Sequence, residues 1–324
     1  MTSTTNNINI SILDAKALNP GDLSWEKLCQ FANIEVYDET DPSQIISRSK
    51  NAQIIIINKV QITADILDQL PLLRCIIITA TGFNNVDILG AKAHKVIVCN
   101  APNYSTNSVA QHVFAMLMNI YCKISDYAND TRKGVWTKSH CFCCNNHSTA
   151  ELAGKTIGIV GLGNIGAKVA NIANAFGMKI LSLTSKEQSE LPDYIRAVNK
   201  QNLLENSDIV TLHTPLTKQT ENFIDEEALK IIKHGAVVIN TARGGLVCEQ
   251  AVANALATKQ LSAYGADVLS SEPPTDTNPL LHAPNAYITP HIAWATHEAR
   301  QRLMDITINN VITFLKNEPI NIVK

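Results

Sequence analysis

The feature that most constrains the fold is the glycine-rich stretch GKTIGIVGLGNIG, which ends at Gly166. Its apolar part, Thr156–Val160, is long enough for a buried strand. Gly161, Gly163 and Gly166 follow with G-x-G-x-x-G spacing and lead into an apolar helical pattern. In a strand–turn–helix unit these glycines allow a tight turn, close approach of a pyrophosphate, and close helix packing. The stretch therefore predicts a dinucleotide-binding unit, the alternative being a glycine-rich turn without a ligand.

Apolar runs alternate with helical patterns along the first hundred residues. Strands are expected at Ile8–Leu13, Ile34–Tyr37, Ile54–Ile57, Cys75–Thr79 and Val96–Cys99. Helices are expected at Asp22–Phe31, Pro42–Lys50, Thr63–Leu70 and Val86–His94. Strands that alternate with helices indicate a parallel, doubly wound sheet.

The second half repeats this alternation. Further strands are expected at Lys179–Thr184, Asp208–Leu212, Ala236–Asn240, Ala263–Asp267 and Ala286–Thr289. Helical patterns cover Thr106–Lys123, Glu226–Lys233, Glu249–Thr258 and Thr296–Leu315. Because the last helix is expected to return to the first domain, that domain would be discontinuous. We therefore predict an α/β chain with two doubly wound parallel sheets: a flavodoxin-like substrate domain (1–103 plus 292–324) and a Rossmann nucleotide-binding domain (104–291).

Length and charge exclude several classes of protein. A chain of 324 residues is long for one core, which favours two domains. The formal net charge of −2 gives no general attraction to nucleic acid or acidic membranes. No apolar run reaches the roughly 18 residues that span a bilayer, and MTSTTNNINI lacks the features of a signal peptide. We therefore expect a cytoplasmic protein that binds neither nucleic acid nor membranes.

Three cysteines, Cys141, Cys143 and Cys144, lie together between His140 and His147. A metal site is one interpretation. The C-x-C-C pattern, however, lacks the paired C-x2-C spacing of structural zinc sites. We expect instead a loop that leads into the nucleotide-binding strand, and no metal site.

The end of the second strand of the nucleotide-binding unit bears on the choice of cofactor. NAD-preferring sites usually have an acidic residue there, which accepts from the ribose 2′-OH. Here the strand ends in Thr184, Ser185 and Lys186, and the next carboxylate is Glu187, which we expect to lie outside the pocket. Two hydroxyls and an ammonium suit a 2′-phosphate, which a carboxylate would repel. The pattern favours NADPH, with NADH as the alternative if Lys186 is solvated.

Three polar residues, Arg243, Glu272 and His291, each follow an expected strand of the second domain. Ligands of open α/β sheets bind beyond the carboxyl ends of the strands. Each residue also has an ordinary interpretation, as a surface charge, a turn residue or a loop histidine. Together they predict a site beside the nicotinamide ring.

These three residue types suit the reduction of a 2-oxo acid. A guanidinium binds a carboxylate through two hydrogen bonds. A histidine titrates near neutral pH and can donate the proton that the reduced ketone needs. A carboxylate beside an imidazolium stabilises its charged form.

Together with GLGNIG, LHTPLT at Leu212–Thr217 and ATGFNNVD at Ala80–Asp87, this constellation resembles the D-isomer-specific 2-hydroxyacid dehydrogenase family over nearly the whole chain. The resemblance implies that Arg243 binds the substrate carboxylate and polarises the carbonyl. It also implies that Glu272 pairs with His291, the proton donor. The resemblance further implies a homodimer formed through the nucleotide domain. It also implies a cleft between the domains that closes on the substrate and excludes water.

The resemblance also implies binding residues. Backbone N–H groups of the turn containing Ala80, Thr81 and Gly82 would bind the substrate carboxylate. Cofactor contacts would come from Thr106, Asn164, Ile165, His213, Thr214, Pro215, Thr241, Ala242 and Asp267, with Arg243 and His291 beside both ligands. Two positions depart from the family pattern: Thr184 replaces a frequent Asp, which puts NAD preference in doubt, and Cys248 replaces the Asp of GGLVDE. Glu272 argues against a formate dehydrogenase, which has a glutamine there.

Within the family, ATGFNNVD and PHIAWAT look most like glycerate dehydrogenases, also called hydroxypyruvate reductases. Trp294 would then line the substrate pocket, either of its own subunit or, by reaching across the dimer, of the partner. The alternative is that Trp294 only packs at the start of the last helix. We expect hydroxypyruvate first and glyoxylate second.

Two other functions stay open. A phosphoglycerate dehydrogenase would need cations for the phosphate; the Thr79–Val86 turn has none, although Lys59 ends a neighbouring strand. The second is a cofactor-sensing binding protein like the C-terminal binding proteins, which resemble this fold and act as corepressors. The chain has no basic run for DNA and no extended disordered tail, so we favour the enzyme, and turnover of hydroxypyruvate would separate the two.

Overall fold

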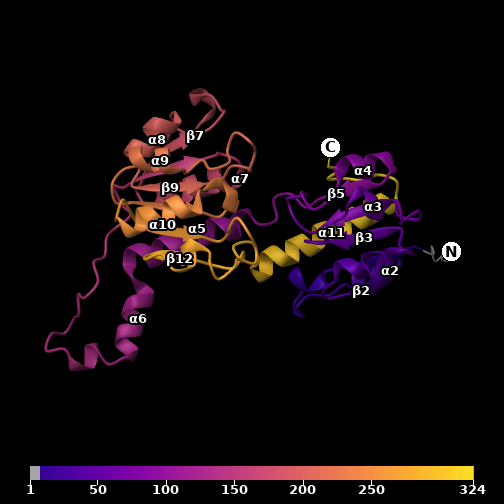
Figure 1. Cartoon of the computed structure of the whole chain (residues 1–324), viewed down its shortest axis with the longest axis horizontal. Helices are drawn as coiled ribbons and strands as arrows, with labels where there is room; N and C mark the ends of the chain where they lie inside the picture. The colour runs from indigo at the N-terminus through magenta and orange to yellow at the C-terminus, as the bar shows by residue number, and fades with distance from the viewer. Residues whose placement is uncertain (1–7, 324) are drawn as a thin grey trace. The chain divides into compact units, whose positions relative to one another are not determined.

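The computed structural model describes residues 8–323 (Figure 1). The chain divides into two compact units, one formed by Met1–Tyr104 with Ala295–Lys324 and the other by Ser105–Trp294. Each unit contains one sheet, and all strand pairs in both sheets are parallel. The predicted fold class, with two doubly wound parallel sheets, is confirmed.

The first unit has a five-stranded sheet in the order β2-β1-β3-β4-β5. Its strands are β1 (Asn9–Ile12), β2 (Asn33–Val36), β3 (Ile54–Ile57), β4 (Cys75–Ile78) and β5 (Ile97–Cys99). This is the flavodoxin-like order, in which the chain order of neighbouring strands reverses between β1 and β3 while all strands stay parallel. Every residue of β3 and β4 is buried, as expected for central strands covered on both faces.

Helices α1 (Glu26–Cys29), α2 (Ile45–Ser49), α3 (Ala64–Leu67), α4 (Ile88–Ala93) and α11 (His297–Leu315) accompany this sheet. The helix expected over Asp22–Phe31 is wrong in its first part, since only α1 forms. The Asn19 side chain accepts from the backbone N–H groups of Gly21 and Leu23, at 3.0 and 2.9 Å. Such a local side-chain turn competes with the helix.

The second unit has a seven-stranded sheet in the order β12-β11-β10-β9-β6-β7-β8. Its strands are β6 (Thr156–Val160), β7 (Lys179–Leu183), β8 (Ile195–Ala197), β9 (Ile209–Leu212), β10 (Ala236–Asn240), β11 (Leu261–Ala266) and β12 (Ala286–Ile288). The first six strands in chain order have the 3-2-1-4-5-6 arrangement of the Rossmann fold, with one more parallel strand at the edge. The order reverses between β6 and β9.

The helices of this unit are α5 (Thr106–Cys122), α6 (Ile124–Arg132), α7 (Asn164–Ala175), α8 (Lys200–Asn206), α9 (Glu226–Ile231) and α10 (Glu249–Ala257). Three elements were not expected from the sequence: α6, β8 and α8. Helix α6 has no buried residue, so no apolar period marks it. Strand β8 has only three residues, and α8 buries only two leucines. Neither segment is therefore long enough in apolar residues to show a strand or helix period.

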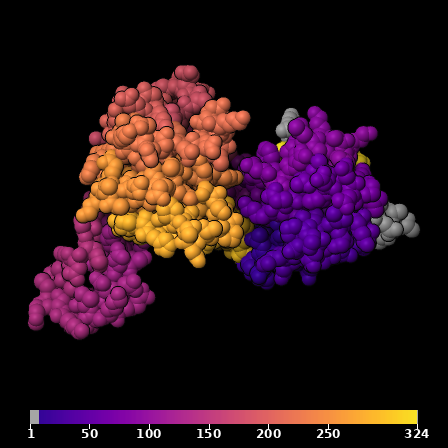
Figure 2. Space-filling model, in the orientation of Figure 1, coloured from indigo at the N-terminus to yellow at the C-terminus, as the bar shows by residue number. Residues whose placement is uncertain are grey.

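Helix α6 and the segment that follows it project from the rest of the second unit (Figures 1 and 2). Cys141, Cys143 and Cys144 lie in this segment, outside any helix or strand. Within residues 8–323, no group of three or more His, Cys, Asp and Glu side chains is placed to hold a metal ion. In the same range, every helix is too short or too polar to cross a bilayer.

Candidate active site

The glycine-rich turn lies where the order of the second sheet reverses, directly after β6. Gly161 has φ +90°, and a Cβ there would lie 2.6 Å from the carbonyl oxygen of His213. A Cβ on Gly166 would lie 2.1 Å from the carbonyl oxygen of Gly161, whereas a Cβ on Gly163 would meet no atom within 4 Å. The geometry fits the three glycine roles: a tight turn, close helix packing, and open space at the second glycine.

Helix α7 begins at Asn164 with Gly163 as its N-cap residue, which has no side chain to accept from the first-turn N–H groups. A helix N-terminus of this kind suits a phosphate. After β10, another strand of the same sheet, the Thr241 hydroxyl oxygen is buried without a hydrogen-bond partner among the described residues. A buried hydroxyl of this kind can pair with a bound polar group. These features fit a dinucleotide.

His213, Thr214 and Pro215 follow β9, on the far side of the contact with Gly161. The His213 Nε2 lies 2.9 Å from the Thr211 hydroxyl. Burial lowers the pKa of His213 to about 4. The ring is therefore neutral at pH 7 and adds no positive charge to this loop.

The end of β7 carries Thr184, Ser185 and Lys186. The Thr184 hydroxyl accepts from the Lys186 backbone N–H at 3.2 Å, and the Lys186 side chain is exposed. The Glu187 carboxylate belongs to a capping box with Glu190 at the start of the next turn. Two carboxylates close to the strand end in sequence, Glu187 and Glu190, thus take part in this capping box.

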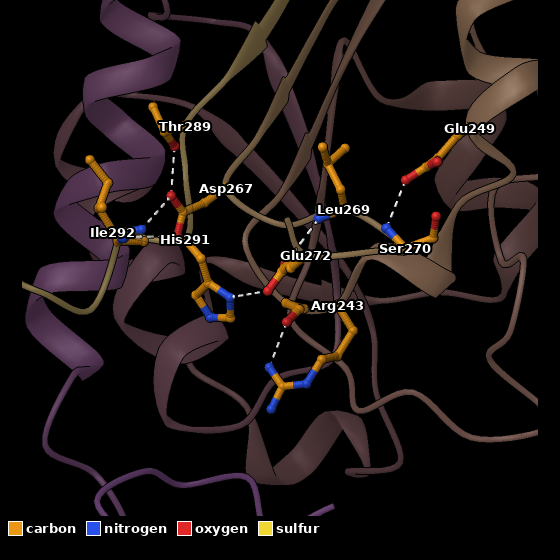
Figure 3. Close-up of polar contacts among 11 residues, drawn as sticks. Arg243, Glu249, Asp267, Leu269, Ser270, Glu272, Thr289, His291 and Ile292 are labelled. Carbon is orange, nitrogen blue, oxygen red and sulfur yellow. Dashed lines mark hydrogen bonds and ion pairs between the residues drawn. The ribbon is translucent and has the colours of Figure 1, made fainter. Parts of the chain in front are cut away.

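Glu272 and His291 are in direct contact (Figure 3). The His291 Nδ1 lies 2.6 Å from Glu272 Oε2, and the second carboxylate oxygen accepts from the Leu269 N–H at 3.1 Å. Their side chains are 29% and 35% exposed, so a ligand can reach the pair. Because the contact uses Nδ1, the Nε2 atom is the one that can face a substrate.

Arg243 follows β10, which is two strands from β12 in the sheet. Its guanidinium is exposed, and Nη1 donates to the carbonyl of the preceding residue, Ala242, at 2.7 Å. Buried Asn240 holds this turn, since its side chain donates to the Arg243 carbonyl and accepts from the Ala242 N–H.

A buried carboxylate, Asp267, supports the turn that carries His291 (Figure 3). Asp267 is 1% exposed and accepts from the Thr289 hydroxyl at 2.6 Å and from the N–H groups of Ile292 and Ala293, both at 2.8 Å. His291 has φ +56°, a conformation that is costly for a residue with a side chain. These bonds offset that cost and hold the imidazole in place.

His112 of α5 completes this support, and sequence reasoning missed it. Its Nε2 lies 2.9 Å from the Thr289 hydroxyl and 3.7 Å from Asp267 Oδ1. Asn240 was missed in the same way. A polar residue inside an apolar helix or strand is the signal that could have indicated each of them, although it does not name the partner.

The expected substrate loop, Ala80–Gly82, follows β4 in the first unit. The Thr81 hydroxyl donates to the Ala101 carbonyl at 2.9 Å, and the Thr81 carbonyl accepts from the Asn100 side chain at 2.8 Å. In the other unit, Thr106 is the first residue of α5, and half-buried Trp294 follows the His291 turn.

Comparison with known proteins decides the family. The model of the D-isomer specific 2-hydroxyacid dehydrogenase NAD binding domain matches residues 114–293, more than half of the chain. The chain belongs to this family. It is an NAD(P)-dependent oxidoreductase with the two-sheet fold of the D-2-hydroxyacid dehydrogenases.

Similar proteins span almost the whole dehydrogenase. A hydroxypyruvate reductase of Blautia hydrogenotrophica is 38% identical, with 98% of this chain and 99% of the relative covered. A glycerate dehydrogenase of Methylorubrum extorquens is 42% identical, with 89% and 91% covered. Among solved structures, an acyclic imino acid reductase in complex with NADPH and D-Arg is 32% identical, with a TM-score of 0.85 and 98% and 100% covered.

Proposed function

We propose that this dehydrogenase reduces hydroxypyruvate to D-glycerate, and glyoxylate to glycolate more slowly. The observation that carries the proposal is the contact of 2.6 Å between His291 Nδ1 and Glu272 Oε2 at the carboxyl edge of the second sheet. The names of the relatives, hydroxypyruvate reductase and glycerate dehydrogenase, support this substrate class.

In this proposal His291 donates the proton to the developing alkoxide, and Glu272 stabilises the imidazolium before transfer. Arg243 binds the substrate carboxylate, a role that its exposed guanidinium supports. The Ala80–Gly82 backbone donates to the same carboxylate, and Trp294 lines the pocket. The substrate domain is 1–103 plus 292–324, and the nucleotide domain is 104–291.

The reduced cofactor supplies the hydride when it is bound. Its pyrophosphate would lie at the glycine turn, on Gly161, Gly163 and Gly166 and on the start of α7. The remaining contacts would come from Thr106, Asn164, Ile165, His213, Thr214, Pro215, Thr241, Ala242 and Asp267. NADPH is preferred over NADH, because Thr184, Ser185 and Lys186 end β7 without a carboxylate. The NADPH in the similar imino acid reductase structure supports the same choice.

The enzyme forms a homodimer through its second unit. Projecting helix α6 and the segment after it support this, because Trp136 and Phe142 are 54% and 89% exposed there. Large apolar side chains exposed together mark surfaces that bind protein. The cytoplasmic location stays a prediction.

Turnover with purified protein tests the proposal. We expect hydroxypyruvate to drive rapid oxidation of NADPH, which is measured as the loss of the ultraviolet absorbance of the reduced cofactor. The His291→Asn variant should lose about 10²- to 10⁴-fold in kcat while its affinity for NADPH is unchanged. The matched control is His234→Asn, an exposed histidine of the same unit. Full activity of His291→Asn, or no turnover of hydroxypyruvate and glyoxylate by the unmodified protein, would contradict the proposal.

A further inference from the structure

The loop that carries Glu272 has no helix or strand of its own. It runs from residue 267, after β11, to residue 278, before the short helical turn Pro279–Leu281. Loops of this length need contacts from elsewhere to keep one conformation. The position of Glu272, and with it the contact to His291, therefore depends on what holds this loop.

Glu249, the first residue of α10, holds the loop at two points. One carboxylate oxygen accepts from the Ser270 N–H at 2.7 Å (Figure 3), and the other accepts from the Asn278 side chain at 2.8 Å. Asn278 is 8% exposed, and its own oxygen accepts from the Leu280 N–H at 3.0 Å. One carboxylate thus joins the start and the end of the loop to α10.

The loop is held close to Glu272 itself. Ser270 follows Leu269, whose N–H donates to Glu272 Oε1 at 3.1 Å. Gly244, next to Arg243, packs on the same two residues: a Cβ there would lie 1.9 Å from the Leu269 carbonyl carbon and 2.2 Å from the Ser270 nitrogen. The turn of Arg243 and the loop of Glu272 therefore pack against each other without space for a side chain.

We propose that Glu249 is a positioning residue, which fixes the loop of Glu272 and thereby the Glu272–His291 pair. This proposal rests on the proposed function, because one of its two measurements is the reduction of a 2-oxo acid. Glu249 accepts from the Ser270 N–H and from the Asn278 side-chain amide, and both belong to the loop that carries Glu272. Glu249 therefore acts on the reaction only through the position of Glu272. A carboxylate in the first turn of a helix interacts favourably with the helix dipole, and hydrogen bonds to a carboxylate are stronger than those to a neutral acceptor.

The hydrogen-bond pattern predicts how to break this contact and how to restore it. In Glu249→Gln the amide oxygen can accept from the Ser270 N–H, but the NH2 group then faces the NH2 group of Asn278. Asn278 cannot turn over without loss of its bond from the Leu280 N–H. With Asn278→Asp added, the Gln NH2 group has a carboxylate to donate to, and the number of charges is unchanged.

The experiment compares Glu249→Gln, Asn278→Asp and the double variant with the unmodified enzyme. Glu226→Gln is the matched control, because Glu226 is the exposed first residue of another helix, α9. The measurements are kcat and KM for reduced cofactor and 2-oxo acid, and hydrogen exchange of the peptide covering 268–280. We expect each single variant to lose about tenfold in kcat with KM for the cofactor within twofold, because a positioned group has shifted. Exchange in the loop should be faster in both.

The double variant should restore kcat and exchange to within about threefold of the unmodified enzyme. A merely structural role would lower thermal stability and leave kcat per folded enzyme unchanged. The proposal is overturned if Glu249→Gln behaves like Glu226→Gln, or if the double variant is no better than the single ones. If the unmodified protein turns over no 2-oxo acid, the proposed function fails, and rescue of loop exchange by the double variant alone decides the role of Glu249.

Discussion

The two parallel sheets differ in what occupies the backbone N–H groups where their strand order reverses. In the first unit, Asp14 follows β1 and accepts from the N–H groups of Asn58, Lys59 and Val60, at 2.7, 2.6 and 3.2 Å. In the second unit, the equivalent strand β6 is followed by Gly161, and the N-cap of α7 is Gly163, with open space beside it.

A carboxylate of the chain therefore occupies the N–H groups of the first crevice, whereas glycines leave the second available to an anion from outside. Both sheets have a reversal of the kind that binds ligands in many open α/β folds. The fold alone does not make a phosphate site, because the residue after the first strand decides it. The predictions that follow test this contrast, from the largest expected effect to the smallest.

Gly163→Asp would give the second unit a carboxylate like that of the first. We expect the affinity for NADPH to fall by about 100-fold or more, since the new charge lies where phosphate would bind. Thermal stability should hold or rise, because Asp is a favoured N-cap residue. Gly163→Ala is the control, with a smaller loss. Fluorescence titration measures both affinities, and retention of affinity within threefold in Gly163→Asp would refute the contrast.

Asp14→Ala would free the N–H groups of the first crevice. We expect it to lower the free energy of unfolding by about 2 kcal/mol, because three backbone donors lose their acceptor. A cavity of about 490 Å³ lined by Asp14, Lys59 and Thr63 can admit water, which limits the loss. Denaturant unfolding measures the change, with exposed Asp38→Ala as the control. The affinity for NADPH should stay within twofold, and a large drop there would show that the first crevice also serves the cofactor.

Lys186→Glu tests whether the end of β7 sets the preference of the second crevice for NADPH over NADH. We expect the ratio of kcat/KM for NADPH to that for NADH to fall about tenfold, since the ammonium near a 2′-phosphate becomes a carboxylate. Exposed Lys218→Ala is the control for a lost surface cation. Steady-state kinetics with both cofactors give the ratio, and an unchanged ratio would remove Lys186 from the cofactor site.

Two carboxyl groups should respond to pH in opposite directions. Burial raises the pKa of Asp14 above 3.8, against the pull of its three backbone donors. The native state thus holds that proton more tightly, and the contribution of Asp14 to stability declines as pH rises from 3.8 through its raised pKa.

Asp208, in the second unit, has the opposite shift. Burial opposes it, but the Lys233 ammonium and the Thr156 N–H together hold the pKa of Asp208 below 3.8. Its contribution is complete above 3.8 and is lost as pH falls through the lowered pKa. The free energy of unfolding should therefore fall with rising pH above 3.8 because of Asp14, and rise with pH below 3.8 because of Asp208. Asp14→Asn should remove the first slope and Asp208→Asn the second, as denaturant unfolding at a series of pH values would show. Slopes of equal sign would contradict the assignment.

Local sequence predicted the elements that carry a strong apolar signal. β3 and β6 have the bounds that were expected, and the glycine spacing indicated the turn after β6. The expectation failed where tertiary contacts or short patterns decide. The Asn19 turn replaced part of a helix, and α6, β8 and α8 carry too few buried residues to show a period.

The sequence by itself determined the fold class, the glycine turn and the three polar residues at strand ends, because these depend on spacing along a strand or a helix. Only the tertiary structure decided which side chains hold the loops at the carboxyl ends of the strands. Asp14, Glu249 and Asp267 accept from backbone N–H groups of loops 44, 21 and 25 residues away. Every residue except proline offers such a donor, so the sequence carries no mark of the partner, and the folded chain alone selects it.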